Sequence, residues 1–338
     1  MILRGFWCHV LPTLLVTACQ ATAEIELLLP PAPEVLPISA WADADGFTLR
    51  WILKGPSSPL GPDDRVRVGD RVLRLRQLQA ADVQVSQLQA SGQVVPAPIT
   101  SLAFRQAAAP VHVALVLDNS AAAAGFDYPE QWRVIGAQGI VDGVLCSAAP
   151  CVPDGDITLV VLEGDRTEVR ASRSRDSRAL EEALKTLPQD AGGTAPLWSG
   201  LQQALAALRP RGSAGSAAIV LYSLRGVDPS YAPAPQALLQ TLAEQPPAPL
   251  FAVQHDGQAE DLRGPVEASG GALLAADAHR DLDGAFAAAR CALAGAWEAQ
   301  VRAALPGDAR RLQGELRLRV ASETRSAAFD LPLLRRPQ

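Results

Sequence analysis

Short apolar runs and helical segments alternate through the middle of the chain, residues 111–291. The first run, residues 111–117, is apolar at nearly every position, which is typical of a strand buried on both faces. Strands separated by helices of this length predict a parallel sheet covered on both sides, and right-handed crossovers make it doubly wound and Rossmann-like. We therefore expect an α/β domain over residues 110–294. Further strands are expected at residues 156–162, 168–171, 217–223, 250–253 and 271–274, and helices at 129–145, 177–187, 197–208, 235–244 and 282–291.

The segments on either side of this domain alternate apolar and polar residues with a period of two, the pattern of a half-buried strand. The alternation runs over residues 47–53 before the domain and over 297–305, 316–320 and 329–333 after it. A glycine and an aspartate at the centre of residues 66–72 predict a hairpin.

Three short C-terminal strands are too few to be stable without packing against something else. We therefore expect residues 295–338 to pack with residues 38–109 in one β-sandwich, into which the α/β domain is inserted. Two separate β pieces are the alternative.

The amino terminus has the features of an export signal. Arg4 precedes an apolar stretch, residues 5–16, which is too short to span a bilayer. The stretch ends in Val-Thr-Ala-Cys, which resembles a bacterial lipobox and predicts a lipoprotein signal peptide over residues 1–18 with lipidation of Cys19. Cleavage after Ala23 by ordinary signal peptidase and an uncleaved, buried segment are the alternatives. The Leu- and Pro-rich residues 19–37 then form a tether.

These features predict an exported protein. Gln20, rather than aspartate, follows Cys19, which favours the outer membrane or the cell surface; a periplasmic or secreted protein is the alternative. A triacylated cysteine holds a protein firmly on a membrane. The formal net charge of −6 argues against a nucleic-acid partner, and 48% hydrophobic residues with 20% charged residues exclude a disordered tail.

The remaining cysteines suit an oxidising compartment. Cys146 and Cys151 frame a short loop, and a local disulfide between them is expected, with two reduced thiols as the alternative. Cys291 is left outside this pair, on the last helix of the domain. No histidine or third cysteine is near the pair in sequence, so we do not expect a metal site there.

Several short motifs follow one another along the α/β part of the chain. Leu-Val-Leu-Asp-Asn-Ser ends the first strand at residues 115–120, and Gly-Gly-Thr-Ala-Pro-Leu precedes a helix at residues 192–197. The strand at 219–223 and the segments at 251–255 and 268–274 continue the series. Together they resemble a von Willebrand factor type A (VWA) domain of the exported bacterial type. The resemblance implies a metal-ion-dependent adhesion site (MIDAS) at the carboxyl ends of the strands.

The family coordinates a metal ion there with an aspartate, two serines, a threonine and a second aspartate. Asp118, Ser120 and Thr194 stand at three of these positions, whereas Ala122 replaces the second serine and Leu224 the second aspartate. Since Mg²⁺ takes six oxygen ligands, the sequence predicts a degenerate MIDAS and no cofactor, with weakly bound Mg²⁺ as the alternative. The substitutes considered for the lost carboxylate are Asp228 and Asp256.

The resemblance implies an adhesion-like module that binds an envelope or surface protein at the carboxyl edge of the sheet. We expect no enzymatic activity, because the chain lacks a G-x-S-x-G elbow, a phosphate-binding glycine loop and H-E-x-x-H. A hydrolase using Ser120, His255 and Asp256 is one alternative, and a purely structural envelope module is the other. Structural interpretations are also open: Asp118 as an acceptor for loop amides, Ser120 and Thr194 as helix caps, and His255, Trp132 and Trp198 as packing residues.

Overall fold

The computed structural model describes a large part of the chain. The described residues are 34–54, 65–68, 71–74, 78–121, 123, 131–145, 154–188, 196–208, 216–224, 236–244, 248–255, 260–276, 281–320 and 323–335. The predicted signal peptide, Cys19, Ala122, the Cys146–Cys151 pair, Thr194, Asp228 and Asp256 lie outside them. Each helix in the described part of the chain is too short or too polar to span a lipid bilayer.

A six-stranded sheet forms the centre of the α/β part, in the order β10-β9-β8-β11-β12-β13. All neighbouring strands are parallel except β10, the edge strand, which is antiparallel to β9. Every residue of β8 is buried, which explains its continuous apolar run. The bounds are β8 Val111–Asp118, β9 Gly155–Glu163, β10 Arg166–Ser174, β11 Ser216–Ser223, β12 Leu250–His255 and β13 Ala272–Ala276.

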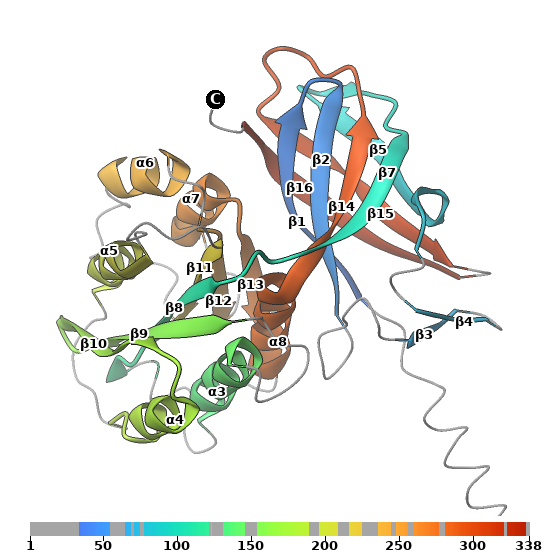
Figure 1. Ribbon diagram of the computed structural model, residues 1–338. Coiled ribbons are helices and arrows are strands. Elements are labelled where there is room, and N and C mark those ends of the chain that lie inside the picture. The colour runs from blue at the N-terminus through green and yellow to red at the C-terminus, as the bar shows by residue number, and fades with distance from the viewer. Residues whose placement is uncertain are drawn as a thin grey trace, which may run out of the picture.

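Helices cover both faces of this sheet, so the predicted doubly wound fold is confirmed (Figure 1). One face packs against α3 (Trp132–Val144), α4 (Ser177–Lys185) and α8 (Asp281–Ala294). The other face packs against α5 (Leu197–Leu208), α6 (Gln236–Glu244) and α7 (Glu260–Ser269). The sequence pattern did not predict α7, since Pro265 lies inside it and proline disfavours a helix interior.

The described strands before and after the α/β part join in an eight-stranded sheet with the order β6-β5-β15-β16-β1-β2-β14-β7. The first strand, β1, pairs in parallel with the last, β16, so the flanking segments do not form two separate β pieces. The bounds are β1 Glu34–Asp43, β2 Gly46–Lys54, β5 Val83–Ala90, β6 Gln93–Val94, β7 Ile99–Gln106, β14 Gly295–Arg302, β15 Arg311–Val320 and β16 Glu323–Arg335, with a short 3-10 helix, η2 Ala80–Asp82, before β5.

The eight-stranded sheet curves around one apolar core. Leu88 of β5, Trp51 of β2 and Trp297 of β14 all belong to this core, although their strands lie far apart in the sheet. The sandwich is therefore one continuous sheet folded over its own buried face. Within the core, the rings of Trp51 and Trp297 stack with their centroids 5.7 Å apart.

The predicted tether is shorter than expected, because β1 already begins at Glu34. The prediction that residues 34–37 belong to the tether is therefore wrong. Pro37 obscured the strand, since proline is uncommon inside strands, and the pairing of β1 with β2 shifts register between Pro37 and Ser39.

The two parts of the molecule share a packed interface. Ile38 and Ile52 of the eight-stranded sheet belong to the same apolar cluster as Leu293 of α8. At the end of α7, Gly270 has a φ of +70°, and a Cβ there would lie 2.7 Å from the Trp41 ring. The interface therefore leaves room only for glycine at this position.

Candidate functional site

Three polar side chains form a row where the central strands end. The register places Ser223 of β11 beside Asp118 of β8, and Gln254 of β12 beside Ser223. All three side chains are buried: Asp118 is 0% exposed, Ser223 2% and Gln254 3%. Residues two positions earlier in these strands pack toward α5, α6 and α7, so the row faces the same side of the sheet.

Both carboxylate oxygens of Asp118 accept hydrogen bonds within the protein. The Ser120 N–H donates to Oδ1 at 2.9 Å, and the Ser223 hydroxyl donates to Oδ2 at 3.3 Å. The Ser120 hydroxyl oxygen in turn accepts from the Ala123 N–H at 3.4 Å. This geometry agrees with the structural interpretation of Asp118 and with Ser120 as a cap for the chain that follows β8.

Asn119, the one asparagine of the chain, connects three segments at this edge. Its N–H donates to the Leu162 carbonyl at 2.9 Å and its Nδ2 to the Pro188 carbonyl at 3.1 Å. Its Oδ1 accepts from Nη2 of Arg133 at 2.6 Å, and Arg133 is a buried residue of α3. Asn119 thus fixes the end of β8 to β9, to the chain after α4 and to α3.

Sequence reasoning missed Gln254 and the link between Asn119 and Arg133. Within the described part of the chain, neither polar atom of the buried Gln254 side chain has a hydrogen-bond partner. The available signals were a polar residue late in an otherwise apolar strand and a single asparagine next to the candidate aspartate. Neither signal predicts which residue lies beside it in space. Strand register places Gln254 beside Ser223, and helix packing brings Arg133 to Asn119.

The described side chains at this edge do not make a ligand set for a resident Mg²⁺. They offer one carboxylate, Asp118, and the hydroxyls of Ser120 and Ser223, and all three groups already hydrogen-bond within the protein. Leu224 packs against the apolar cluster of α3 and α8. Among the described residues, no group of three or more histidine, cysteine, aspartate or glutamate residues could hold a metal ion.

The alternative of a hydrolase depends on Ser120 as a nucleophile. Ser120 is 0% exposed, and its oxygen already accepts a backbone hydrogen bond. The backbone of His255 ends β12, while its side chain and Asp256 lie outside the described residues. The described geometry therefore presents no serine hydroxyl to solvent at this edge.

The described cysteine Cys291 lies on α8, the last helix of the α/β part, as the sequence predicted, and the structure shows that it is buried. Its thiol donates to the Leu53 carbonyl at 3.7 Å, which joins α8 to β2. Trp132 opens α3 and Trp198 lies in α5, and both pack against the apolar clusters that flank the sheet. These residues contribute to the fold and do not converge on the Asp118 row.

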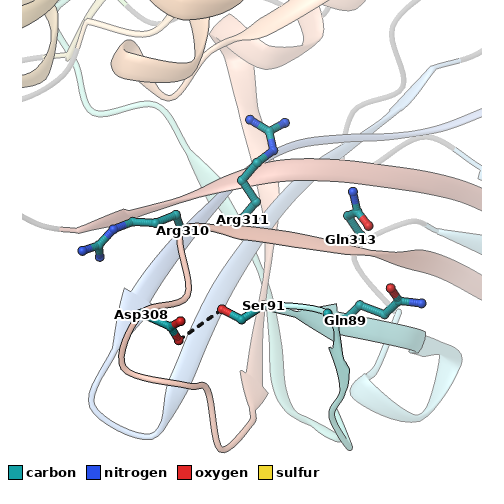
Figure 2. A pocket seen from close by; sticks show the side chains of 7 residues that line it. Gln89, Ser91, Asp308, Arg310, Arg311 and Gln313 are labelled. Atoms are coloured by element: carbon teal, nitrogen blue, oxygen red, sulfur yellow. Dashed lines mark hydrogen bonds between the residues drawn. The ribbon is translucent and has the colours of Figure 1, made fainter.

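A polar pocket of about 270 Å³ lies elsewhere, between the β5–β6 turn and the start of β15 (Figure 2). Asp308 accepts from the Ser91 hydroxyl at 3.2 Å, and Arg311 pairs with Glu267 of α7 at 2.7 Å. The hydrogen bond to Glu267 raises the pKa of Arg311 above its ordinary value. Figure 2 shows Arg310 and Gln89 extending in opposite directions. The side chains do not converge on a common point, so the Asp118 row remains the stronger candidate.

Comparisons with known proteins give structural matches only. No protein-family model and no curated protein sequence matches the chain. The SpRpn10 VWA domain is 17% identical, with a TM-score of 0.40, over 51% of this chain and 92% of that one. The von Willebrand factor type A protein from Catenulispora acidiphila is 14% identical, with a TM-score of 0.42, over 75% of this chain and 73% of that one.

A third match is proximal thread matrix protein 1 from the mussel byssus, solved with a zinc-occupied MIDAS motif. It is 14% identical, with a TM-score of 0.43, over 61% of this chain and 50% of that one. The present chain thus spans half the length of that protein.

Proposed function

We propose that this chain is an exported, envelope-anchored interaction module that binds a protein partner at the carboxyl edge of its six-stranded sheet. We further propose that its MIDAS is degenerate and that binding needs no metal ion. The observation that carries the proposal is the bonding of Asp118, whose two oxygens accept from Ser120 and Ser223. A carboxylate that satisfies buried protein donors is poorly placed to share its charge with a cation.

The location of the polar groups supports the choice of this edge. Open α/β sheets bind their ligands outside the carboxyl ends of the strands. Asn119 ties β8 to three other segments there, so the edge is held in one arrangement before a partner arrives. A docking surface ordered in advance loses less conformational entropy on binding.

The sequence supports the anchoring part of the proposal. The apolar stretch and the residues before Cys19 suit lipidation, and a lipidated Cys19 places the folded part beside a membrane. Radiolabelled fatty acid should be incorporated into the wild-type chain in cells and not into Cys19→Ala. Equal labelling of both chains would show that Cys19 is not the anchor.

Site-specific photocrosslinking in intact envelopes tests the docking edge. Ala121 is exposed just after Ser120, and Ala108 is exposed before the opposite end of the same strand, so the two positions form a matched pair. A photoreactive residue at position 121 should give one discrete protein adduct, and the same residue at position 108 should give none. Adducts of equal yield from both positions, or from 108 alone, would favour a purely structural module.

Thermal melts test the absence of a metal requirement. A ligand present at 100 times its Kd adds about 2.7 kcal/mol to stability, which shifts the melting temperature by several degrees. Millimolar Mg²⁺, Mn²⁺ or chelator should each leave the melting temperature of the chain unchanged within error. A shift of several degrees with either metal, reversed by chelator, contradicts the degenerate site.

A further inference from the structure

A short hairpin stands apart from both large sheets (Figure 1). Its strands are β3 (Arg65–Val68) and β4 (Arg71–Arg74), and they pair only with each other among the described residues. An isolated two-stranded hairpin is marginally stable in water and needs a further surface to pack against. The strand pairing of the two larger sheets therefore does not account for the stability of this hairpin.

The register sorts the hairpin into two unlike faces. Residues that pair across an antiparallel ladder share a face, as do residues two apart along a strand. One face therefore has three of the four arginines, and the other has three of the four apolar residues. Arg65, Arg67 and Arg74 share the first face with Val72, and Val66, Val68 and Leu73 share the second with Arg71.

The charge of this segment is opposite to that of the whole chain. Residues 65–76 contain five arginines and one aspartate, a net charge of +4, whereas the chain has a formal net charge of −6. Arginine binds phosphate with two parallel hydrogen bonds, and clustered basic residues are attracted to anionic lipid. The hairpin thus concentrates the positive charge that an anionic surface would recognise.

The strand that precedes the hairpin in the sequence ends beside the residue at which the predicted tether joins the sheet. Glu34, the first residue of β1, pairs with Lys54, the last residue of β2. The chain therefore arrives from the tether and leaves toward the hairpin at one end of the sheet. Fourteen residues lie between Cys19 and Glu34, and the fifteen Cα–Cα steps from one to the other span at most about 50 Å, so an anchored molecule keeps this end near the membrane.

We infer that the β3–β4 hairpin binds the phosphate headgroups of anionic phospholipids with its arginine face, and so orients the anchored molecule on the membrane. The orienting role rests on the proposed anchoring, whereas lipid binding by the hairpin does not. Because the rest of the chain is negative, contact with an anionic membrane is favourable through this segment and unfavourable through most others.

Vesicle sedimentation of the purified full chain tests the inference. Partitioning is measured on phosphatidylcholine vesicles and on vesicles that also contain phosphatidylglycerol. The quantity compared between variants is the increment, defined as the gain in partitioning that the anionic phosphatidylglycerol produces. The amino-terminal segment, including Arg4, is the same in every variant, so its contribution cancels when the increments of two variants are compared. The hairpin variant is R65Q/R67Q/R74Q, and the matched control is R166Q/R178Q/R302Q, which removes three exposed arginines from other elements.

Each basic residue near an anionic surface strengthens binding about fivefold. The gain in partitioning due to anionic lipid should therefore be about a hundredfold smaller for the hairpin variant than for the wild type. The control variant should keep the increment, and R65K/R67K/R74K should keep most of it. High salt should weaken the wild-type increment, since exposed charges are screened. Circular dichroism checks that every variant is folded.

An increment that survives R65Q/R67Q/R74Q overturns the inference, and so does equal loss in the control variant. Absence of any increment, together with hairpin-dependent binding to polyglutamate, would point to an acidic protein instead. None of these outcomes depends on Cys19. A failure of the anchoring proposal would appear separately, in the fatty-acid labelling of Cys19→Ala.

Discussion

The two large sheets bury their strands in different ways. In the six-stranded sheet, helices cover both faces, and all eight residues of β8 are buried. In the eight-stranded sheet, β14 alternates between core residues such as Trp297 and outward residues such as Glu298 and Arg302. The first sheet can therefore present polar groups only at its strand ends, whereas the second presents them over a whole face.

The outer face of the eight-stranded sheet illustrates this difference. Glu298 lies 3.5 Å from Arg50 and 3.7 Å from Arg105. Burial lowers the pKa of Arg50, and the charge of Glu298 partly offsets this effect. Ion pairs that solvent still partly reaches, such as Arg50–Glu298, each contribute little to stability, so the sheet depends on its inner core.

The largest expected effects come from deleting a core residue in each sheet. Trp51→Ala removes a buried ring that stacks on Trp297, and Leu115→Ala removes a buried side chain from β8. Each should cost about 3–5 kcal/mol of unfolding free energy, as large-to-small changes in cores do. Chemical denaturation monitored by circular dichroism measures both losses.

The same experiment tests whether the sheets unfold together. Ile38 and Ile52 share an apolar cluster with α8, so both substitutions should shift one cooperative transition. Two separate transitions, each moved by one substitution only, would show that the parts unfold independently. Val94→Ala is the control, since Val94 is 73% exposed and its loss should change stability by less than about 0.5 kcal/mol.

The different burial of the two sheets also explains what the sequence could predict. The run at residues 111–117, apolar at every position except His112, placed β8, and alternation over residues 47–53 placed β2. The pattern missed α7, with its internal Pro265, and the beginning of β1 around Pro37, because a proline within an element opposes its local preference.

The candidate site was predicted less completely than the fold. Asp118 and Ser120 were found because a strand end followed by a polar motif is visible in one short segment. Ser223 as the donor to Asp118, and Arg133 as the donor to Asn119, depend on contacts between residues 105 and 14 positions apart. Such contacts follow from sheet order and helix packing, which a local pattern does not specify.

A smaller effect is expected from the helices that cover the six-stranded sheet. A Cβ at Gly136 of α3 would overlap the buried ring of Phe286 in α8, whereas at Gly139 it would meet only Nη1 of Arg290, at 3.9 Å. Gly136→Ala should therefore destabilise the protein by about 1–3 kcal/mol through overpacking. Gly139→Ala should stabilise it by up to about 1 kcal/mol, because alanine favours a helix.

These two variants form a matched pair, since they make the same chemical change on the same helix. Unfolding free energies from denaturant titration give both values. Equal effects of the two substitutions would mean that α3 and α8 are not packed as closely as the position of Phe286 requires.

The smallest effect is expected on the open face of the eight-stranded sheet. Arg317 donates to Oε2 of Glu315 from Nε at 2.8 Å and from Nη2 at 2.5 Å, and Ser86 donates to the same oxygen at 3.3 Å. The hydrogen bond from Arg317 is the main cause of the lowered pKa of Glu315. Arg317→Gln should therefore raise the pKa of Glu315 toward its ordinary value, as measured by carbon NMR of the carboxyl group.

The sign of the pH dependence follows from this direction. A carboxyl group with a lowered pKa in the folded state stabilises the protein above the pKa of the unfolded chain, near 4.3, and the stabilisation is lost as the pH falls through the folded pKa. The small stability difference between the wild type and Arg317→Gln should thus be present at neutral pH and vanish in acid. Arg302→Gln, on another strand of the sheet, should leave the Glu315 titration unchanged. If that variant shifted the titration equally, the general field of the arginines on the sheet, rather than the hydrogen bond from Arg317, would hold the Glu315 carboxylate in its charged form.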